Sequence, residues 1–299
     1  MDRRGFLLGA TGLLAAGCAR VPPPGTVPSV PTPPVAPAAP PLAVGTDGTP
    51  AGDMLAELLA GSLRAKGRQA TVQPAGLDWR AALASGDLAA VPGFAGTLWD
   101  GLSGKDEPPA TGDLLADLAE LVSPEVGVFS APGLDGGLVW LVTTATAGKG
   151  ITSLSRVASW SRGRRAAIPS LARSRGDGVP GLRTVYRAVF AYDVVEAPPE
   201  RAARLAGGQA AVAAFRRTEY TGTPGLVALV DPEKLGAADP GVVLVNNSVA
   251  DAEPDHVLAL DAVARAITTD SLLDLQAQVA AGGTPSGVAD RWLQEQGIA

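Results

Sequence analysis

The chain has 299 residues, a net charge of −6, 46% hydrophobic residues, and only one Cys and one His. These counts exclude an internal disulfide and a zinc site of the usual ligand types. The acidic balance and the 4% aromatic content exclude the basic surface and the stacking platforms of a nucleic-acid-binding protein. The chain is long enough to bury a core in one large domain or in two lobes.

Residues 1–17 have the features of an export signal. A basic start is followed by an apolar run without charge over residues 5–17. That run is shorter than the roughly 20 residues needed to cross a membrane, and it ends in small residues, as secretory signals do. The run that begins Arg3-Arg4 resembles the twin-arginine export motif. The sequence leaves open whether the general secretory or the twin-arginine route is used.

The only Cys of the chain, Cys18, directly follows this run. The segment Leu-Ala-Ala-Gly-Cys that ends at Cys18 resembles a bacterial lipobox, in which the Cys is lipidated and becomes the first mature residue. The alternative is an ordinary cleaved signal with a chance Cys. Residues 18–42 contain ten prolines, too many for a helix or a sheet. We therefore expect a lipid anchor on Cys18, followed by an extended tether.

The rest of the chain, from about residue 43, alternates between predicted strands and helices. Apolar residues recur with the period of a helix or form short strand-like runs. Strands are expected near 42–45, 70–72, 86–91, 137–143, 166–168, 209–214, 225–231 and 242–246. Helices are expected near 53–66, 78–85, 112–121, 153–160, 181–190, 199–206, 255–267, 270–281 and 286–295. This alternation predicts an α/β fold with a parallel-rich sheet and helices on both faces.

Several runs, taken in order, resemble the substrate-binding proteins of osmoprotectant ABC importers, which bind glycine betaine, choline or carnitine. The matching runs begin at Gly45-Thr46, Ser85-Gly86-Asp87, Pro92-Gly93-Phe94, Arg175-Gly176-Asp177, Gly208 and Ala266. The likeness covers nearly all of residues 43–299. Each motif alone is weak, whereas the ordered set is specific.

The resemblance implies a two-lobed periplasmic-binding-protein fold of type 2, a Venus flytrap with two crossover hinge strands at 137–143 and 225–231. Lobe 1 would comprise 43–140 plus 228–299, and lobe 2 would comprise 141–227. A small-molecule solute would bind in the cleft, with no cofactor and no metal. The closed monomer would then dock on an ABC permease and its ATPase, at the outer face of the bacterial cytoplasmic membrane.

The same resemblance implies ligand contacts at Asp47, Thr49, Phe94, Gly96, Thr97, Arg175, Asp177 and Thr218. A quaternary ammonium group is held by aromatic faces. However, Val91, Leu138, Arg216 and Asp239 stand where the family has Tyr. Losing three or four rings at about 1 kcal/mol each weakens a betaine-like ligand by roughly two to three powers of ten.

Each of these residues also has a purely structural interpretation. Phe94 could belong to the core, Thr97 could cap a helix, Arg175 could pair with Asp177 instead of an anionic ligand, and Asp47 could be solvated. Other residues also have two interpretations. Trp99 and Trp140 either rebuild part of a cage or lie in the core. Arg216-Arg217 could face an acidic ligand but is expected to be a solvated pair, and His256 is expected at the surface.

The leading hypothesis is a lipid-anchored solute-binding subunit of an ABC importer. Its aromatic cage is degenerate, so its ligand is a small polar or zwitterionic molecule that need not be a betaine. The alternative is an envelope lipoprotein that keeps the fold as a non-transport scaffold, with a cleft filled by Val91, Leu138 and their neighbours. An enzyme is not expected, because the sequence has no metal set, no Gly-rich phosphate loop and no plausible triad.

Overall fold

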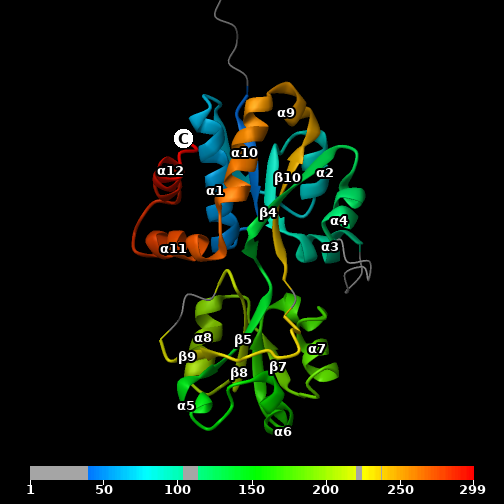
Figure 1. Cartoon of the computed structure of the whole chain (residues 1–299), viewed down its shortest axis with the longest axis vertical. Coiled ribbons are helices and arrows are strands. Elements are labelled where there is room, and N and C mark those ends of the chain that lie inside the picture. Colours follow the sequence, from blue (N-terminus) through cyan, green and yellow to red (C-terminus); the bar gives the residue numbers. More distant parts are fainter. Residues whose placement is uncertain (1–39, 104–113, 220–223, 237) are drawn as a thin grey trace, which may run out of the picture. The chain divides into compact units, whose positions relative to one another are not determined.

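The computed structural model describes residues 40–103, 114–219, 224–236 and 238–299. Within these ranges the chain forms two five-stranded sheets, with strand orders β2-β1-β3-β10-β4 and β7-β6-β8-β5-β9 (Figure 1). The predicted export signal, Cys18 and nearly all of the proline-rich tether lie outside the described residues.

The helices and strands fall into three consecutive groups. Before the chain enters the second sheet, the elements are β1 Leu42–Thr46, α1 Pro50–Ala65, β2 Ala70–Pro74, α2 Trp79–Ser85, β3 Ala90–Phe94, α3 Ala95–Ser103, α4 Leu114–Val122 and β4 Val126–Asp135. The second group is β5 Leu138–Thr143, α5 Thr144–Ala147, η1 Leu154–Arg156, α6 Val157–Ser161, β6 Arg165–Ile168, η2 Ser170–Arg173, α7 Val179–Thr184, β7 Ala191–Val194, α8 Pro198–Ala206, β8 Val212–Arg216 and β9 Leu226–Ala228. The last group is β10 Pro240–Asn246, α9 Asn247–Ala252, α10 Pro254–Ala266, α11 Thr269–Ala280 and α12 Pro285–Glu295.

Helix α1 shows how the sequence sets the boundaries of an element. The side chain of Thr49 accepts a hydrogen bond from the Gly52 amide, and Pro50 stands in the first turn, where its missing N–H costs nothing. One apolar face, which includes Leu55, Leu58 and Leu59, is buried against the first sheet. Cap and apolar face therefore act together to hold α1 beside β1.

The central strands of both sheets are covered by helices on both faces. In β10, Val243 and Val245 belong to a cluster with α1, α10, α11 and α12, whereas Val242 and Leu244 pack with α2, α3 and α4. In the second sheet, Leu141 packs on the α8 side and its neighbours in β5 pack on the other side. Since successive side chains of a strand point to opposite faces, these continuous apolar runs fit doubly covered strands.

The expectation of a parallel-rich sheet was wrong, because both sheets are mixed. β1 is parallel to β2 and β3, but β10 is antiparallel to β3 and β4. In the second sheet, β6 is parallel to β7 and β8, and β5 is antiparallel to β8 and β9. The alternation of helices and strands predicts layers but does not fix strand direction.

Six of the described elements lie outside the predicted ranges, namely α3, β4, α5, η2, β7 and α9. In β4, Gly127, Pro132 and Gly133 interrupt the apolar pattern. β4 lies at the edge of its sheet, where a proline without an amide hydrogen is tolerated.

The helix expected at 181–190 ends at Thr184, and Arg187 has a left-handed φ of 57° that no continuing helix would adopt.

The two apolar strands expected at 137–143 and 225–231 are β5 and β9, which are antiparallel neighbours in the second sheet. The chain passes from the first sheet to the second between Asp135 and Leu138, and returns between Ala228 and Pro240 (Figure 1). These two connections are the only links between the sheets along the described chain.

His256 corrects a second expectation, since it is 5% exposed and not a surface residue. It lies in the first turn of α10, one turn before the buried Leu260, so both side chains share the face that packs against the sheet.

Among the described helices, none combines the length and the apolar character that a membrane crossing requires.

Candidate functional site

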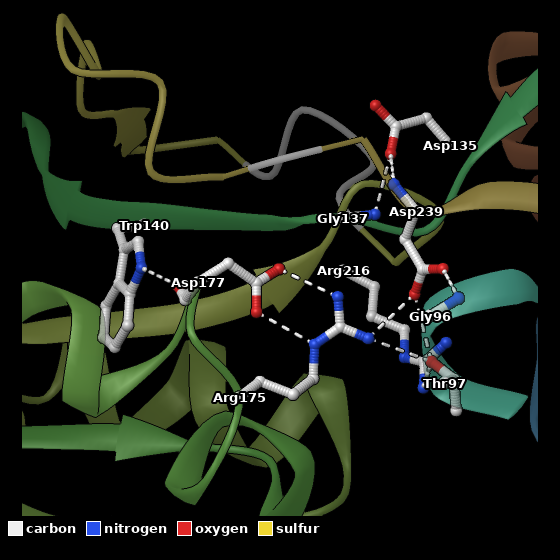
Figure 2. A network of polar contacts seen from close by, with 9 residues as sticks. All are labelled: Gly96, Thr97, Asp135, Gly137, Trp140, Arg175, Asp177, Arg216 and Asp239. Atoms are coloured by element: carbon white, nitrogen blue, oxygen red, sulfur yellow. Dashed lines mark hydrogen bonds and ion pairs between the residues drawn. The ribbon is translucent and has the colours of Figure 1, made fainter. Parts of the chain in front are cut away.

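Asp239 places a buried carboxylate at the N-terminus of α3. Its Oδ1 accepts a hydrogen bond from the Gly96 amide at 2.7 Å, and its Oδ2 accepts bonds from the Thr97 hydroxyl at 3.0 Å and Arg175 Nη1 at 2.9 Å (Figure 2). The Asp239 side chain is 1% exposed. The free amides and the dipole of a helix N-terminus stabilise an anion. The chain's own carboxylate therefore fills this anion site.

Gly96 is needed for this close approach. A Cβ atom at this position would lie 3.0 Å from Oδ1 of Asp239, tighter than ordinary van der Waals contact. The lack of a side chain therefore lets the carboxylate reach the backbone of α3.

Arg175 links residues of the two sheets at this point. Its Nε and Nη2 donate to the two carboxylate oxygens of Asp177 at 2.9 and 3.0 Å, while Nη1 donates to Asp239 and, at 3.2 Å, to Thr97 Oγ1. Burial alone would lower the pKa of Arg175, but the hydrogen bonds and charges of Asp177 and Asp239 outweigh it and raise that pKa. Arg175 is therefore a permanent cation held between two buried carboxylates.

Arg216, at the end of β8, is the second cation of this network. Its guanidinium carbon lies 5.4 Å from the ring centroid of Phe94, and its Nη2 donates to Thr97 Oγ1 at 3.3 Å. No carboxylate forms an ion pair with Arg216 among the described residues. This guanidinium therefore covers an aromatic face through a cation–π contact.

A cavity of about 230 Å³ adjoins Phe94, Thr97 and Arg216. The polar groups around it come from Thr46, Asp47, Thr97 and Arg216, and the rest of its wall is apolar. That apolar wall is formed by Ala75, Gly76, Trp79, Val91, Pro92, Gly93, Phe94, Leu98 and Gly101. The cavity thus offers one carboxylate, one guanidinium, two hydroxyls and two aromatic rings to a small molecule.

The two connections between the sheets are tied to each other beside this network. Oδ1 of Asp135 accepts hydrogen bonds from the amides of Gly137 at 2.8 Å and Asp239 at 3.0 Å (Figure 2). The other oxygen of Asp135 pairs with Arg217. The Gly136 amide donates to the Asp239 carbonyl at 2.8 Å. Asp239 therefore belongs both to the anion site and to the junction between the sheets.

Further along the returning connection, Tyr186 holds the segment that begins at Asp231. The Tyr186 hydroxyl donates to Asp231 and accepts from the Glu233 amide at 2.8 Å. Burial, with the hydrogen bond to Asp231 as the next cause, raises the pKa of Tyr186 to about 12. The returning connection is thus anchored at its start by a phenol and at its end by Asp135.

Four of the predicted site residues meet in this network, namely Gly96, Thr97, Arg175 and Asp177. Phe94 lies against it, both in the core of the first sheet and on the cavity wall. Arg175 does pair with Asp177, as its structural interpretation required. Thr97 does not cap a helix, because α3 begins two residues earlier, at Ala95.

The other predicted residues lie outside the network. Asp47 is exposed and lines the cavity, where its Oδ1 accepts from the amide and hydroxyl of Thr49. Thr49 caps α1 and does not line the cavity. Thr218 is fully buried, its Oγ1 has no partner, and its carbonyl accepts from Gln276 at 3.1 Å.

Several residues took on roles that the sequence did not indicate. Asp239 and Arg216 complete the network, although the sequence marked Asp239 only as a missing aromatic ring and Arg216 as a missing ring and one of an arginine pair. The expected solvated pair was wrong, because Arg216 stacks on Phe94 and Arg217 pairs with Asp135. Trp99 and Trp140 are buried, while the half-buried Trp79 lines the cavity. Leu138 packs in the second sheet, and Val91 lines the cavity.

No protein-family model matches this chain, and no curated protein matches it either. Several solved structures do match this chain. One described as a glycine betaine/carnitine/choline ABC transporter has a TM-score of 0.70 at 17% identity, over 86% of this chain and 99% of its own. Apo YehZ from Escherichia coli has a TM-score of 0.66 at 18% identity, over 87% and 100%. An ABC-transporter choline-binding protein in complex with choline has a TM-score of 0.59 at 14% identity, over 86% and 90%.

The fold is therefore that of the periplasmic substrate-binding proteins, which confirms the predicted fold class. The structural neighbours include substrate-binding proteins of glycine betaine, choline and carnitine ABC transporters, which are the family that the sequence resembles. Two of these neighbours are named as binding proteins, one of an ABC transporter for choline and one for glycine betaine and L-proline.

Proposed function

We propose that this protein is the solute-binding subunit of an ABC importer and has no enzymatic role. The observation that carries the proposal is the cavity beside Phe94, Thr97 and Arg216 in a chain with a substrate-binding-protein fold. The wall comes from the first sheet with its loops and helices α2 and α3, except for Arg216, which the second sheet contributes. A solute bound there would contact both sheets, as a closing flytrap requires.

The ligand is a small polar or zwitterionic molecule. The cavity of about 230 Å³ is smaller than the roughly 300–1,000 Å³ of drug-sized pockets. Asp47 can pair with a cationic group at one end of the solute, and the ring of Trp79 can contact an apolar or cationic part of the solute. Arg216 can donate a hydrogen bond to an oxygen of the solute. A quaternary ammonium cage is not assembled, since Val91 is aliphatic and the protein's own cation covers Phe94.

A thermal-shift screen of the purified mature chain tests this proposal, with positives checked by calorimetry. The probes are glycine betaine, choline, carnitine, proline betaine, polyamines and amino acids. A specific solute should raise the melting temperature of the wild type, and Trp79→Ala should weaken its binding. Trp160→Ala is the matched control, because Trp160 lies outside the cavity. No stabilisation by any small solute would contradict the proposed binding role.

A second candidate function is that of an envelope scaffold that keeps the fold without transport. The observation in its favour is that the guanidinium of Arg175 is bound by the carboxylates of Asp177 and Asp239 and not left for a solute. A solute that binds in the screen, and whose uptake is lost when this chain is deleted, would reject the scaffold.

The remaining parts of the proposal concern location and motion. Residues 1–17 direct export, Cys18 carries the lipid anchor, and residues 18–42 hold the body away from the outer face of the cytoplasmic membrane. Lobe 1 comprises 43–140 plus 228–299 and lobe 2 comprises 141–227, and they close as a monomer on a permease with its ATPase. Closure bends the two tied connections around Asp135 and Asp239.

A further inference from the structure

We infer that Asp239 is an internal ligand: its side chain occupies the anion site at the N-terminus of α3 and thereby excludes solutes that would place a carboxylate there. The inference concerns specificity and goes beyond the proposed transport function. Three independent donors converge on this one carboxylate, namely a helix amide, a hydroxyl and a guanidinium. Such convergence is typical of a site that binds an anion.

The geometry favours an internal ligand over an ordinary surface ion pair. The Asp239 side chain is 1% exposed and that of Arg175 is 12% exposed, so both charges have left water. By contrast, Arg165 and Asp193 form the same type of pair with side chains 52% and 31% exposed. Without the Asp239 carboxylate, the Gly96 amide and the Thr97 hydroxyl would lose their acceptor and Arg175 would lose one of its two anionic partners.

The anion site at α3 is occupied without any ligand. The guanidinium of Arg175 pairs with the carboxylates of Asp177 and Asp239 (Figure 2), whereas Arg216 contacts Thr97 and Phe94. A solute carboxylate could reach the Gly96 amide only by displacing Asp239, which would leave that buried charge without its partners. We therefore expect the solute of the neighbouring cavity to place no carboxylate at the Gly96 amide.

Chemical rescue tests this inference directly. Asp239→Ala keeps the backbone bonds of residue 239 to Asp135 and Gly136 but removes the carboxylate. Formate and acetate, added as sodium salts against sodium chloride of equal concentration, are the probes. We expect a saturable rise of at least about 2 °C in the melting temperature of Asp239→Ala. The wild type should show no such rise.

Two further variants separate a specific site from general salt effects. Asp239→Asn still fills the space, so formate should not stabilise it. Asp193→Ala removes the exposed carboxylate from Arg165, and it should respond to formate no more than to chloride. A response of Asp239→Ala that equals that of Asp193→Ala or of the wild type would overturn the inference.

If Asp239→Ala does not fold in plain buffer, the readout becomes its refolding yield from urea in formate compared with chloride. A higher yield in formate supports the internal-ligand role, and equal yields overturn it. This outcome is independent of the solute screen, because the probe is formate bound to a variant and not a solute bound to the wild type. Failure of one proposal therefore leaves the other intact.

Discussion

The guanidinium of Arg216 lies over the ring of Phe94, with its central carbon 5.4 Å from the ring centroid. Phe94 ends β3 in the first sheet and Arg216 ends β8 in the second. An aromatic face that a cationic solute could use is therefore already covered by a cation of the protein. This contact joins the two sheets beside the cavity, and it bears directly on ligand choice.

Removing Arg216 should uncover that face. We expect Arg216→Ala to bind choline more tightly than the wild type by a factor of about 2 to 30, the equivalent of one cation–π contact. Isothermal titration calorimetry measures the change. The control is Arg164→Ala, because Arg164 lies 4.9 Å over the ring of Trp160 away from the cavity. Unchanged or weaker choline binding by Arg216→Ala would show that this face is not a cation site.

Arg175→Ala should be strongly destabilising. The substitution leaves the buried carboxylates of Asp177 and Asp239 without their shared cation, at a cost of about 3–5 kcal/mol in the free energy of unfolding. Urea unfolding measures this cost. Arg165→Ala breaks an exposed pair with Asp193 and should have a far smaller effect. Equal losses in the two variants would refute the importance of burial.

Gly136 is expected to tolerate no side chain. A Cβ at this position would lie 2.5 Å from the Phe94 ring, so Gly136→Ala must push the ring aside at a cost of about 1–3 kcal/mol. Gly101→Ala is the matched control, because nothing lies within 4 Å of its added Cβ and alanine favours the helix. Thermal unfolding compares the two, and equal stability of both variants would contradict the close packing.

The raised pKa of the Tyr186 hydroxyl predicts that the protein loses stability at alkaline pH. Burial and the hydrogen bond to Asp231 raise its pKa to about 12, above the value of about 10 for an unfolded tyrosine. The unfolded chain therefore releases this proton first. The stabilisation is complete below about pH 10 and is lost as the pH rises toward 12. Urea unfolding from about pH 9 to about pH 12, which spans the window between the unfolded and folded pKa values, should reveal the decline.

Tyr186→Phe removes the titrating group from that profile. At neutral pH this variant should lose about 1–3 kcal/mol, because Asp231 and the Glu233 amide lose their partner. Its alkaline decline should be shallower than that of the wild type. Tyr192→Phe is the control, since Tyr192 is exposed, and it should keep the wild-type profile. A decline of the same slope in Tyr186→Phe would assign the effect to other groups.

Cys18→Ala tests the proposed lipid anchor. Expressed in a bacterial host, the wild type should partition with the membrane fraction and incorporate labelled fatty acid. The variant should be released or remain unprocessed, and it should carry no label, because the chain has no other Cys. Membrane retention of Cys18→Ala at the wild-type level would argue against lipidation.

The sequence by itself determined most of the elements and the fold class. Local signals were sufficient there, such as the cap Thr284 followed by Pro285 at the start of α12, because they act within a few residues. It missed β4, whose Gly and Pro residues break the apolar pattern. The strand directions also stayed open, because pairing depends on partners far along the chain.

Only the tertiary structure decided what the site residues do. Arg175 and Asp239 are 64 residues apart in the chain, and Thr97 and Arg216 are 119 apart. No local periodicity links such positions, so the sequence could not indicate that they meet. Folding brings them to one point between the sheets, where burial joins Arg175 and its two carboxylate partners in a network of mutually satisfied charges. The aromatic shortage is thus a feature of the composition, whereas its replacement by ion pairs is a property of the fold.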